Sequence, residues 1–212
     1  MLPRPPRHEL RRRLPRLLVG LVLCGLGIAV MVAAELGLGP WDVLHQGLSR
    51  MTRIPIGTVG ILVGLVVLLA WLPLRERPGV GTVLNVVVIG VVIDVTLLVL
   101  DTPNASWLRW LYMAAGPVLF GVGSGFYIGA GLGAGPRDGI MTGLARRGLS
   151  VGWVRGCLEM SVLALGWLLG GTVGIGTVVF AATIGPIVHV TLPRLAMQDV
   201  PEHPPPGARS AR

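Results

Sequence analysis

The sequence predicts an all-α polytopic membrane protein, with six transmembrane helices as two inverted three-helix repeats, each with a short interfacial or re-entrant helix. Three observations predict this fold class. First, 52% of the 212 residues are hydrophobic, 13% are charged and the mean hydropathy is +0.74, which is too apolar for an ordinary soluble domain. Second, one glycine-rich motif occurs twice together with its surroundings. Third, the arginines gather in alternate segments between the apolar runs.

The repeat is anchored by Gly37-Leu-Gly-Pro-Trp-Asp42, which returns as Gly133-Ala-Gly-Pro-Arg-Asp138. Glycines, a proline and an aspartate that agree in order and spacing indicate two copies of one unit and not merely shared hydrophobicity. In the same register, four further glycines of the first copy, Gly20, Gly25, Gly27 and Gly47, align with Gly116, Gly121, Gly123 and Gly143. The second copy is then one residue shorter in a loop. Beyond that loop, Gly79, Gly81, Thr82 and Gly90 align with Gly174, Gly176, Thr177 and Gly185.

The chain starts with an arginine- and proline-rich segment that we expect to be a basic cytoplasmic tail. The apolar run 17–34 that follows could pass for a cleavable signal peptide, but its counterpart 111–132 lies in mid-chain, so both are predicted to be retained transmembrane helices. The predicted organisation is a tail at 1–15, a first repeat at 16–100, an external connection at 101–111, a second repeat at 112–194 and a disordered cytoplasmic tail at 195–212.

After each first span comes a short helix, at 40–51 and 136–147, too short and polar to cross a bilayer. The prolines at 40 and 136 suit the first helical position, and the aspartates at 42 and 138 suit the first turn. The remaining spans are long enough for the roughly 20 residues that a bilayer requires. They are predicted at 56–74, 80–100, 151–169 and 172–192, with an interfacial loop at 101–110 that contains two tryptophans.

The arginines predict the topology. With six spans and the amino terminus inside, only Arg50, Arg53 and Arg109 fall in outer segments, which predicts that both termini are cytoplasmic. Each repeat has an odd number of spans, so the second copy enters the membrane from the opposite side. The halves are then inverted repeats, an arrangement widespread among secondary transporters.

Ionisable residues inside predicted spans are candidates for binding a substrate or a coupling ion, because burying them in a membrane is costly. Asp94 and His189 are a repeat pair, Glu159 follows Arg155 by one helical turn, and Asn85 adds a polar group. Structural roles compete with these functions. Asp94 and His189 could satisfy polar groups of neighbouring helices, and Arg155 could simply pair with Glu159.

The repeated turns have two interpretations. They could end one helix and start a capped interfacial helix, or they could dip inward as broken helices that present free amides to a substrate. Arg137 has no charged counterpart, because Trp41 occupies its place in the first copy. Gly90 and Gly185, near the middle of their spans, are predicted to let those two helices cross closely. The candidates in the turns are Gly37, Gly39, Pro40, Asp42, Gly133, Gly135, Pro136, Arg137 and Asp138.

Other classes of function lack their signatures. The net charge of +8 comes from arginines flanking apolar runs and not from a basic patch with aromatics, so no nucleic acid is expected. No zinc-protease or nucleophile-elbow motif occurs, so no enzyme is expected. Cys24 and Cys157 are interpreted as small buried hydrophobic residues, and no metal or cofactor is expected.

With Gly37-Leu-Gly-Pro-Trp-Asp42, Gly-Ile-Gly-Thr177 and Gly-Pro-Arg-Asp-Gly139 in view, the chain resembles the YczE-like bacterial integral membrane proteins, within the YczE/YyaS/YitT grouping. The resemblance extends from Arg16 to Arg194. It implies a small multi-pass protein of the bacterial cytoplasmic membrane, and it implies no particular biochemical activity.

These observations lead to two hypotheses about function. The first is a secondary transporter or permease for an unidentified small molecule or ion, embedded in the lipid bilayer as a monomer or a homodimer, with its path between the two repeats. The alternative is a membrane scaffold or accessory factor that supports another membrane or secretory system. The first rests on architecture and is therefore an analogy.

Overall fold

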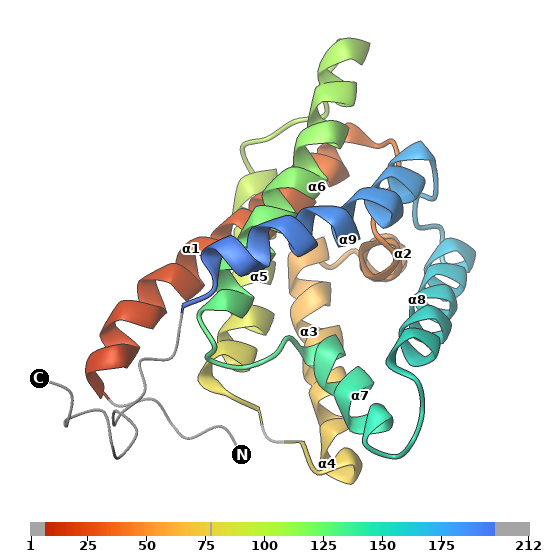
Figure 1. Ribbon diagram of the computed structural model, residues 1–212. Coiled ribbons are helices and arrows are strands. Elements are labelled where there is room, and N and C mark those ends of the chain that lie inside the picture. Colours follow the sequence, from red (N-terminus) through yellow and green to blue (C-terminus); the bar gives the residue numbers. More distant parts are fainter. Residues whose placement is uncertain (1–6, 77, 198–212) are drawn as a thin grey trace, which may run out of the picture.

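The computed structural model describes residues 7–76 and 78–197, and in this part of the chain the helices are joined by loops and turns and there are no strands (Figure 1). Six helical stretches are long and apolar enough to cross a membrane, which confirms the predicted all-α class with six candidate spans. The helices are α1 (Arg7–Ala34), α2 (Pro40–Thr52), α3 (Ile56–Leu69), α4 (Trp71–Leu74), α5 (Val80–Leu97), α6 (Ser106–Gly129), α7 (Pro136–Ala145), α8 (Val151–Leu168) and α9 (Ile175–Leu195). Helices α3 and α4 together form one of the six stretches.

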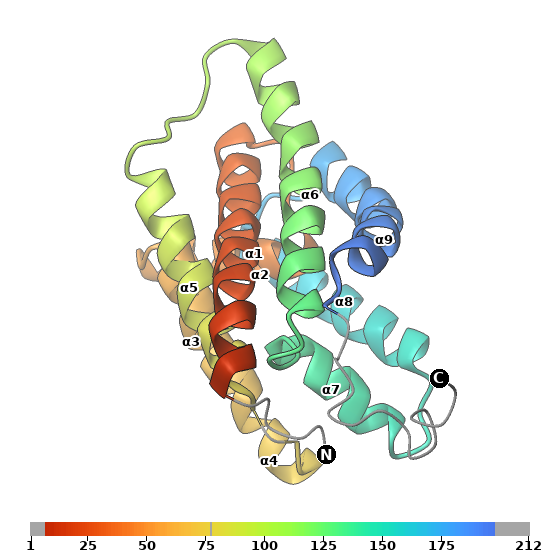
Figure 2. The same cartoon turned by 60° about the vertical axis from the view of Figure 1, so that its left-hand side comes forward.

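The centre of the fold is the crossing of α1 and α6. A Cβ atom built on Gly20 would lie 2.6 Å from the carbonyl oxygen of Gly123, and one on Gly27 would lie 2.7 Å from that of Gly116. Because the later residue of α1 meets the earlier residue of α6, the two helices are antiparallel. Figure 2 shows them side by side, with α5 beyond α1 and α9 beyond α6. Small residues thus bring the two backbones into contact.

Each glycine-rich turn docks on the last long helix of the other half. The backbone N–H of Gly176 donates to the carbonyl of Leu36 at 2.8 Å, and the N–H of Gly81 donates to the carbonyl of Leu132 at 2.9 Å. The turns have left-handed glycines next to these contacts, Gly37 and Gly133. The amino ends of α9 and α5 are therefore each closed by a turn from the opposite half.

The two halves differ in the packing of their third helices. In the first half α3 packs on α5, where a Cβ on Gly90 would lie 2.5 Å from the carbonyl oxygen of Gly57. In the second half α8 makes few close approaches to α9 and packs on α2, with Gly166 against the backbone of Leu44. The predicted crossing of α5 and α9 is wrong, because Gly90 faces α3 and a Cβ on Gly185 would meet nothing within 4 Å.

Several predicted boundaries require correction. The segment 1–15 is not a tail throughout, since α1 begins at Arg7 and Arg13 is only 5% exposed. Arg13 is paired with Glu9 at 3.0 Å and donates to the carbonyl of Ala130 at 3.1 Å, which compensates its burial. Residues 1–6 and 198–212 lie outside the described part.

The loop predicted at 101–110 is also wrong from Ser106 onward, where α6 begins. The short helices begin at Pro40 and Pro136 as predicted, and they end at Thr52 and Ala145. Cys24 is buried as predicted, whereas Cys157 is exposed.

Candidate functional site

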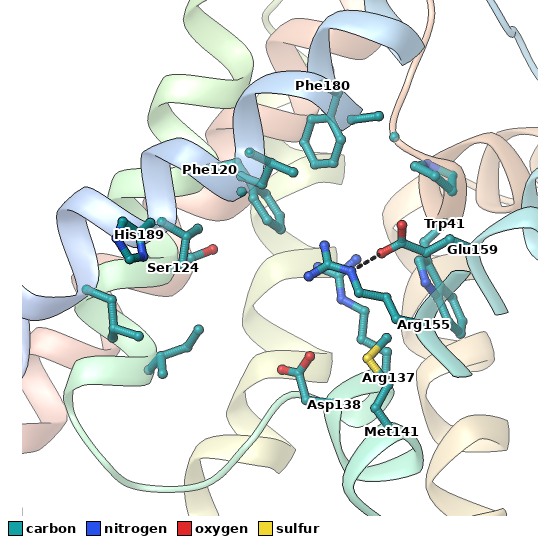
Figure 3. Close-up of a pocket in the computed structure, with 18 of the residues that line it drawn as sticks. Trp41, Phe120, Ser124, Arg137, Asp138, Met141, Arg155, Glu159, Phe180 and His189 are labelled. Atoms are coloured by element: carbon teal, nitrogen blue, oxygen red, sulfur yellow. Dashed lines mark hydrogen bonds and ion pairs between the residues drawn. The ribbon is translucent and has the colours of Figure 1, made fainter. Parts of the chain in front are cut away.

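A cavity of about 420 Å³ lies where α8 diverges from α9 (Figure 3). Its walls come from the amino ends of the short helices α2 and α7, from α8, from the carboxyl half of α6, and from α9 between Phe180 and Pro193. The predicted site residues that line it are Gly39, Pro40, Asp42, Arg137, Asp138, Arg155, Glu159, Gly185 and His189. The repeated turns and the charged residues of α8 therefore meet in one place.

At the amino end of α7, Asp138 serves as a cap. Its Oδ2 accepts a hydrogen bond from the backbone N–H of Gly135 at 3.2 Å and one from the hydroxyl of Tyr127 at 3.2 Å. Pro136, the first residue of α7, accepts at its carbonyl the indole N–H of Trp71 at 2.8 Å. These bonds fix the start of α7 against α6 and α4, and with it the position of Arg137.

Arg137 has its guanidinium carbon 5.6 Å from the centroid of the Phe120 ring, within cation–π range. It has no hydrogen bond or ion pair to any residue in the described part of the chain. Burial acts to lower the pKa of Arg137, but the carboxylates around it, Asp138 foremost and Asp42 and Glu159 beyond, raise the pKa above its ordinary value. The side chain therefore stays a cation with its donors uncommitted.

At the amino end of α2, Trp41 occupies the position that Arg137 has in the second copy. Trp41 is 9% exposed, and its indole nitrogen is buried without a hydrogen-bond partner among the described residues. Asp42 lies 3.5 Å from His45, one turn further along α2. Trp41 was not among the predicted site residues, although the substitution of tryptophan for arginine between the two copies was the signal for it.

Arg155 and Glu159 form the predicted pair one turn apart on α8, with 2.9 Å between Nε and Oε1. In Figure 3 this pair lies on the same side of the cavity as Arg137, opposite His189 of α9 and Ser124 of α6. Phe120 and Phe180 contribute an apolar wall, with their rings 5.5 Å apart. The cavity thus combines a charged side with an aromatic one.

A second, smaller cavity of about 100 Å³ lies between α2, α3 and α5. It shares four residues with the large cavity, namely Trp41, Asp42, Phe120 and Arg137. Much of its remaining lining is the repeat counterpart of the lining of the large cavity. In the repeat register Ile28, Val63, Asn85, Ile89, Gly90 and Ile93 correspond to Ser124, Glu159, Phe180, Ile184, Gly185 and Val188.

Other predicted candidates lie outside both cavities. Gly37 and Gly133 sit in the docked turns, against Thr177 and Thr82 respectively. Asp94, a predicted candidate for binding a substrate or a coupling ion, caps the amino end of α3. Its carboxylate accepts the backbone N–H groups of Gly57 at 2.6 Å and Thr58 at 2.7 Å, together with the Thr58 hydroxyl at 2.7 Å. These three bonds favour the structural role for Asp94.

Replacing Asp94 with alanine is expected to lower the stability of the protein by about 2 kcal/mol, because charge-assisted bonds to the amides of α3 are lost. The measurement is thermal unfolding of the purified protein in detergent. Asp101→Asn, at an exposed position, is the matched control and should leave the midpoint unchanged. An Asp94→Ala protein as stable as this control would refute the capping role.

The sequence is similar to that of known proteins over most of its length. The model of DUF6198, a family of unknown function, matches residues 11–193. An uncharacterized protein of Haemophilus influenzae is 44% identical over 177 residues, covering 83% of this chain and 81% of that protein. The uncharacterized membrane protein YczE of Bacillus subtilis is 35% identical over 191 residues, covering 89% of each. The uncharacterized protein YyaS of Bacillus subtilis is 26% identical over 182 residues, covering 82% of this chain and 90% of that protein.

No solved structure shows a significant match. The similarities to YczE and YyaS confirm the resemblance that the motifs indicate. Together with the six apolar helices, they identify a multi-pass membrane protein. All residues that line the two cavities lie inside the range matched by the family model.

Proposed function

Since the chain belongs to DUF6198, a family of unknown function, we propose from its own geometry that it is a secondary transporter or permease for a small solute. The observation that carries the proposal is the pair of cavities with repeat-equivalent linings, one of about 420 Å³ and one of about 100 Å³. Transporters built from inverted repeats bind their solute between the repeats and open it to each side in turn. A large and a small version of one cavity is what such a cycle requires.

The inverted relation of the halves is part of the proposal, and reciprocal contacts support it. The repeat register exchanges Gly20 with Gly116 and Gly27 with Gly123, so the contact of Gly20 with Gly123 becomes the contact of Gly116 with Gly27. The hydrogen bond between Gly176 and the residue before Gly37 likewise corresponds to the one between Gly81 and the residue before Gly133. Both relations hold for a two-fold axis that passes between the antiparallel helices α1 and α6.

The difference between the halves then gives the direction of movement. In this state α3 is packed on α5 and the cavity on that side is small, while α8 stands away from α9 and the cavity on that side is large. Exchange of the two packings would close the large cavity and open the small one. Trp41 and Arg137 line both cavities, so they stay in contact with the solute throughout. The proposed setting is the bacterial cytoplasmic membrane with both termini in the cytoplasm, and the solute is moved without chemical change.

A single cysteine in the large cavity tests the exchange. The background protein has serine at both native cysteines, and Gly185→Cys adds a thiol where a side chain meets nothing within 4 Å. The cysteine is expected to react with a membrane-impermeant maleimide in right-side-out vesicles and also in inside-out vesicles. Reaction from both sides supports alternating access.

The matched control is Met160→Cys on α8, a position that is 64% exposed and lies outside both cavities. Because it is near the middle of a span, it should face lipid and react from neither side. If Gly185→Cys reacts from one side only, the cavity is static, and the transporter proposal fails in favour of a scaffold or accessory role.

A further inference from the structure

The groups at the junction of the two cavities that lack a partner are hydrogen-bond donors. The guanidinium of Arg137 has no acceptor within bonding distance in the described part of the chain, and its near neighbour is the face of Phe120. The indole nitrogen of Trp41 is buried and has no acceptor there either. A buried donor without an acceptor is costly. A bound molecule that supplies acceptor oxygens would remove that cost.

Each carboxylate around the junction has a partner on one of its two oxygens. Asp138 accepts from Gly135 and Tyr127, Glu159 accepts from Arg155, and Asp42 faces His45. Arg137 and the indole nitrogen of Trp41, by contrast, are donors without an acceptor among the described residues, so the site favours a ligand that supplies acceptor oxygens. In addition, α2 and α7 both start at the cavity, and helix amino ends favour negative charge.

The remaining lining of the large cavity indicates what kind of group the rest of the ligand has. Phe120, Phe180, Ile184, Val188 and Leu192 give it a continuous apolar wall. Such a wall favours a hydrocarbon or aromatic group and excludes a fully hydrated inorganic ion as the preferred occupant.

Building on the proposed function, we propose that the solute is an organic oxyanion, with its carboxylate or phosphate on Arg137 and its apolar body against Phe120 and Phe180. The planar guanidinium fork matches the two oxygens of either headgroup. The indole nitrogen of Trp41 is a third donor to the same headgroup. Because Arg137 lines both cavities, the headgroup keeps this partner when the cavities exchange sizes.

Benzoate, phenyl phosphate, benzyl alcohol and benzylamine form a matched panel that varies the headgroup on one ring. Thermal unfolding in detergent should show the wild-type midpoint rising with benzoate or phenyl phosphate and not with the alcohol or the amine. Phosphatidate in mixed micelles is included to test a lipid source of phosphate. A shift with phosphatidate, but with neither soluble anion, would support the oxyanion site and assign it to a lipid headgroup.

Variants locate the binding. Arg137→Gln should weaken the dissociation constant of the stabilising anion by about tenfold or more, the scale of a charge-assisted bond. Arg137→Lys, which keeps the charge and loses the fork, should weaken it less, and Trp41→Phe should weaken it several-fold through loss of one donor. Arg53→Gln, at an exposed arginine outside both cavities, is the control and should bind like the wild type. If Arg137→Gln does not fold, the lysine and phenylalanine variants decide.

Two results would overturn the inference: stabilisation by the amine or the alcohol in preference to the anions, or anion binding that is unchanged in the Arg137 and Trp41 variants. Neither result depends on movement of the cavity. Anion binding at Arg137 together with labelling of Gly185→Cys from one side would leave a binding site and remove the transporter. Labelling from both sides without anion binding would leave the transporter and remove the substrate class.

Discussion

Replacing Gly27 or Gly123 with valine is expected to abolish most of the folded protein, because the added atoms would enter the backbone of the facing helix. A Cβ on Gly27 would lie 2.7 Å from the carbonyl oxygen of Gly116, and one on Gly123 would lie 2.6 Å from that of Gly20. Backbone atoms cannot move aside as a flexible side chain can. Overpacking of a tight contact costs about 3 kcal/mol or more, a large share of a total stability of about 5–15 kcal/mol.

The measurement is the fraction of folded protein against denaturant after extraction in a mild detergent. Gly156→Val on α8 is the control, since a Cβ there would meet nothing within 4 Å and only helix propensity changes. Gly27 and Gly123 are repeat partners, so their valine variants should lose similar amounts of stability. Unfolding curves like that of the Gly156 variant would contradict the crossing of α1 and α6.

The repeat made the six spans and the starts of the short helices predictable, because these depend on local signals. Apolar length specifies a span, and a proline after glycine specifies where α2 and α7 begin, at Pro40 and Pro136. The same register also predicted that equivalent residues have equivalent surroundings. It could not predict which glycines touch. Gly20 meets Gly123 and not Gly116, its partner in the repeat register.

Distant partners account for most of what the sequence could not predict. The arginines and prolines around the start of α1 predict a tail, whereas Arg13 donates a hydrogen bond to the carbonyl of Ala130 in the other half. Asp94 was predicted as a functional group because the start of α3 beside it was not known. The cavity itself arises from the different packing of α3 and α8, which also differ in sequence, since α8 carries Arg155 and Glu159 and α3 has no charged residue.

The centre of the candidate site was predictable in part from one position at which the two copies of the motif differ in residue type, Trp41 against Arg137. Arg137 was a candidate because it lacks a charged repeat partner, and the structure places it at the junction of both cavities. Trp41, which occupies the equivalent position in the first copy, is uncharged and has a single hydrogen-bond donor on a large aromatic ring. A difference inside an otherwise matched motif was therefore more informative about the site than the matched residues were.

The docked turns carry the second large effect, and Gly37→Ala and Gly133→Ala are expected to destabilise the fold strongly. The φ angles of these glycines are +116° and +138°, values that disfavour any side chain. In addition, a Cβ on Gly37 would lie 2.8 Å from the backbone nitrogen of Gly174, and one on Gly133 would lie 2.8 Å from the hydroxyl oxygen of Thr82. The backbone strain alone costs about 1–3 kcal/mol, and the steric conflict adds to it.

Gly148→Ala separates the two contributions, because its φ is +92° and a Cβ would meet nothing within 4 Å. Its loss of thermal stability should reflect backbone strain alone, so the Gly37 and Gly133 variants should unfold at clearly lower temperatures. Losses no greater than that of Gly148→Ala would mean that the turns do not clamp the opposite half. Similar losses at Gly37 and Gly133 are expected, because the two turns make equivalent contacts. The turn at Gly37 closes the amino end of α9, which lines the large cavity, and the turn at Gly133 closes the amino end of α5, which lines the small one. A clamp at both ends would let α3 and α8 exchange packings while the amino ends of α5 and α9 stay fixed.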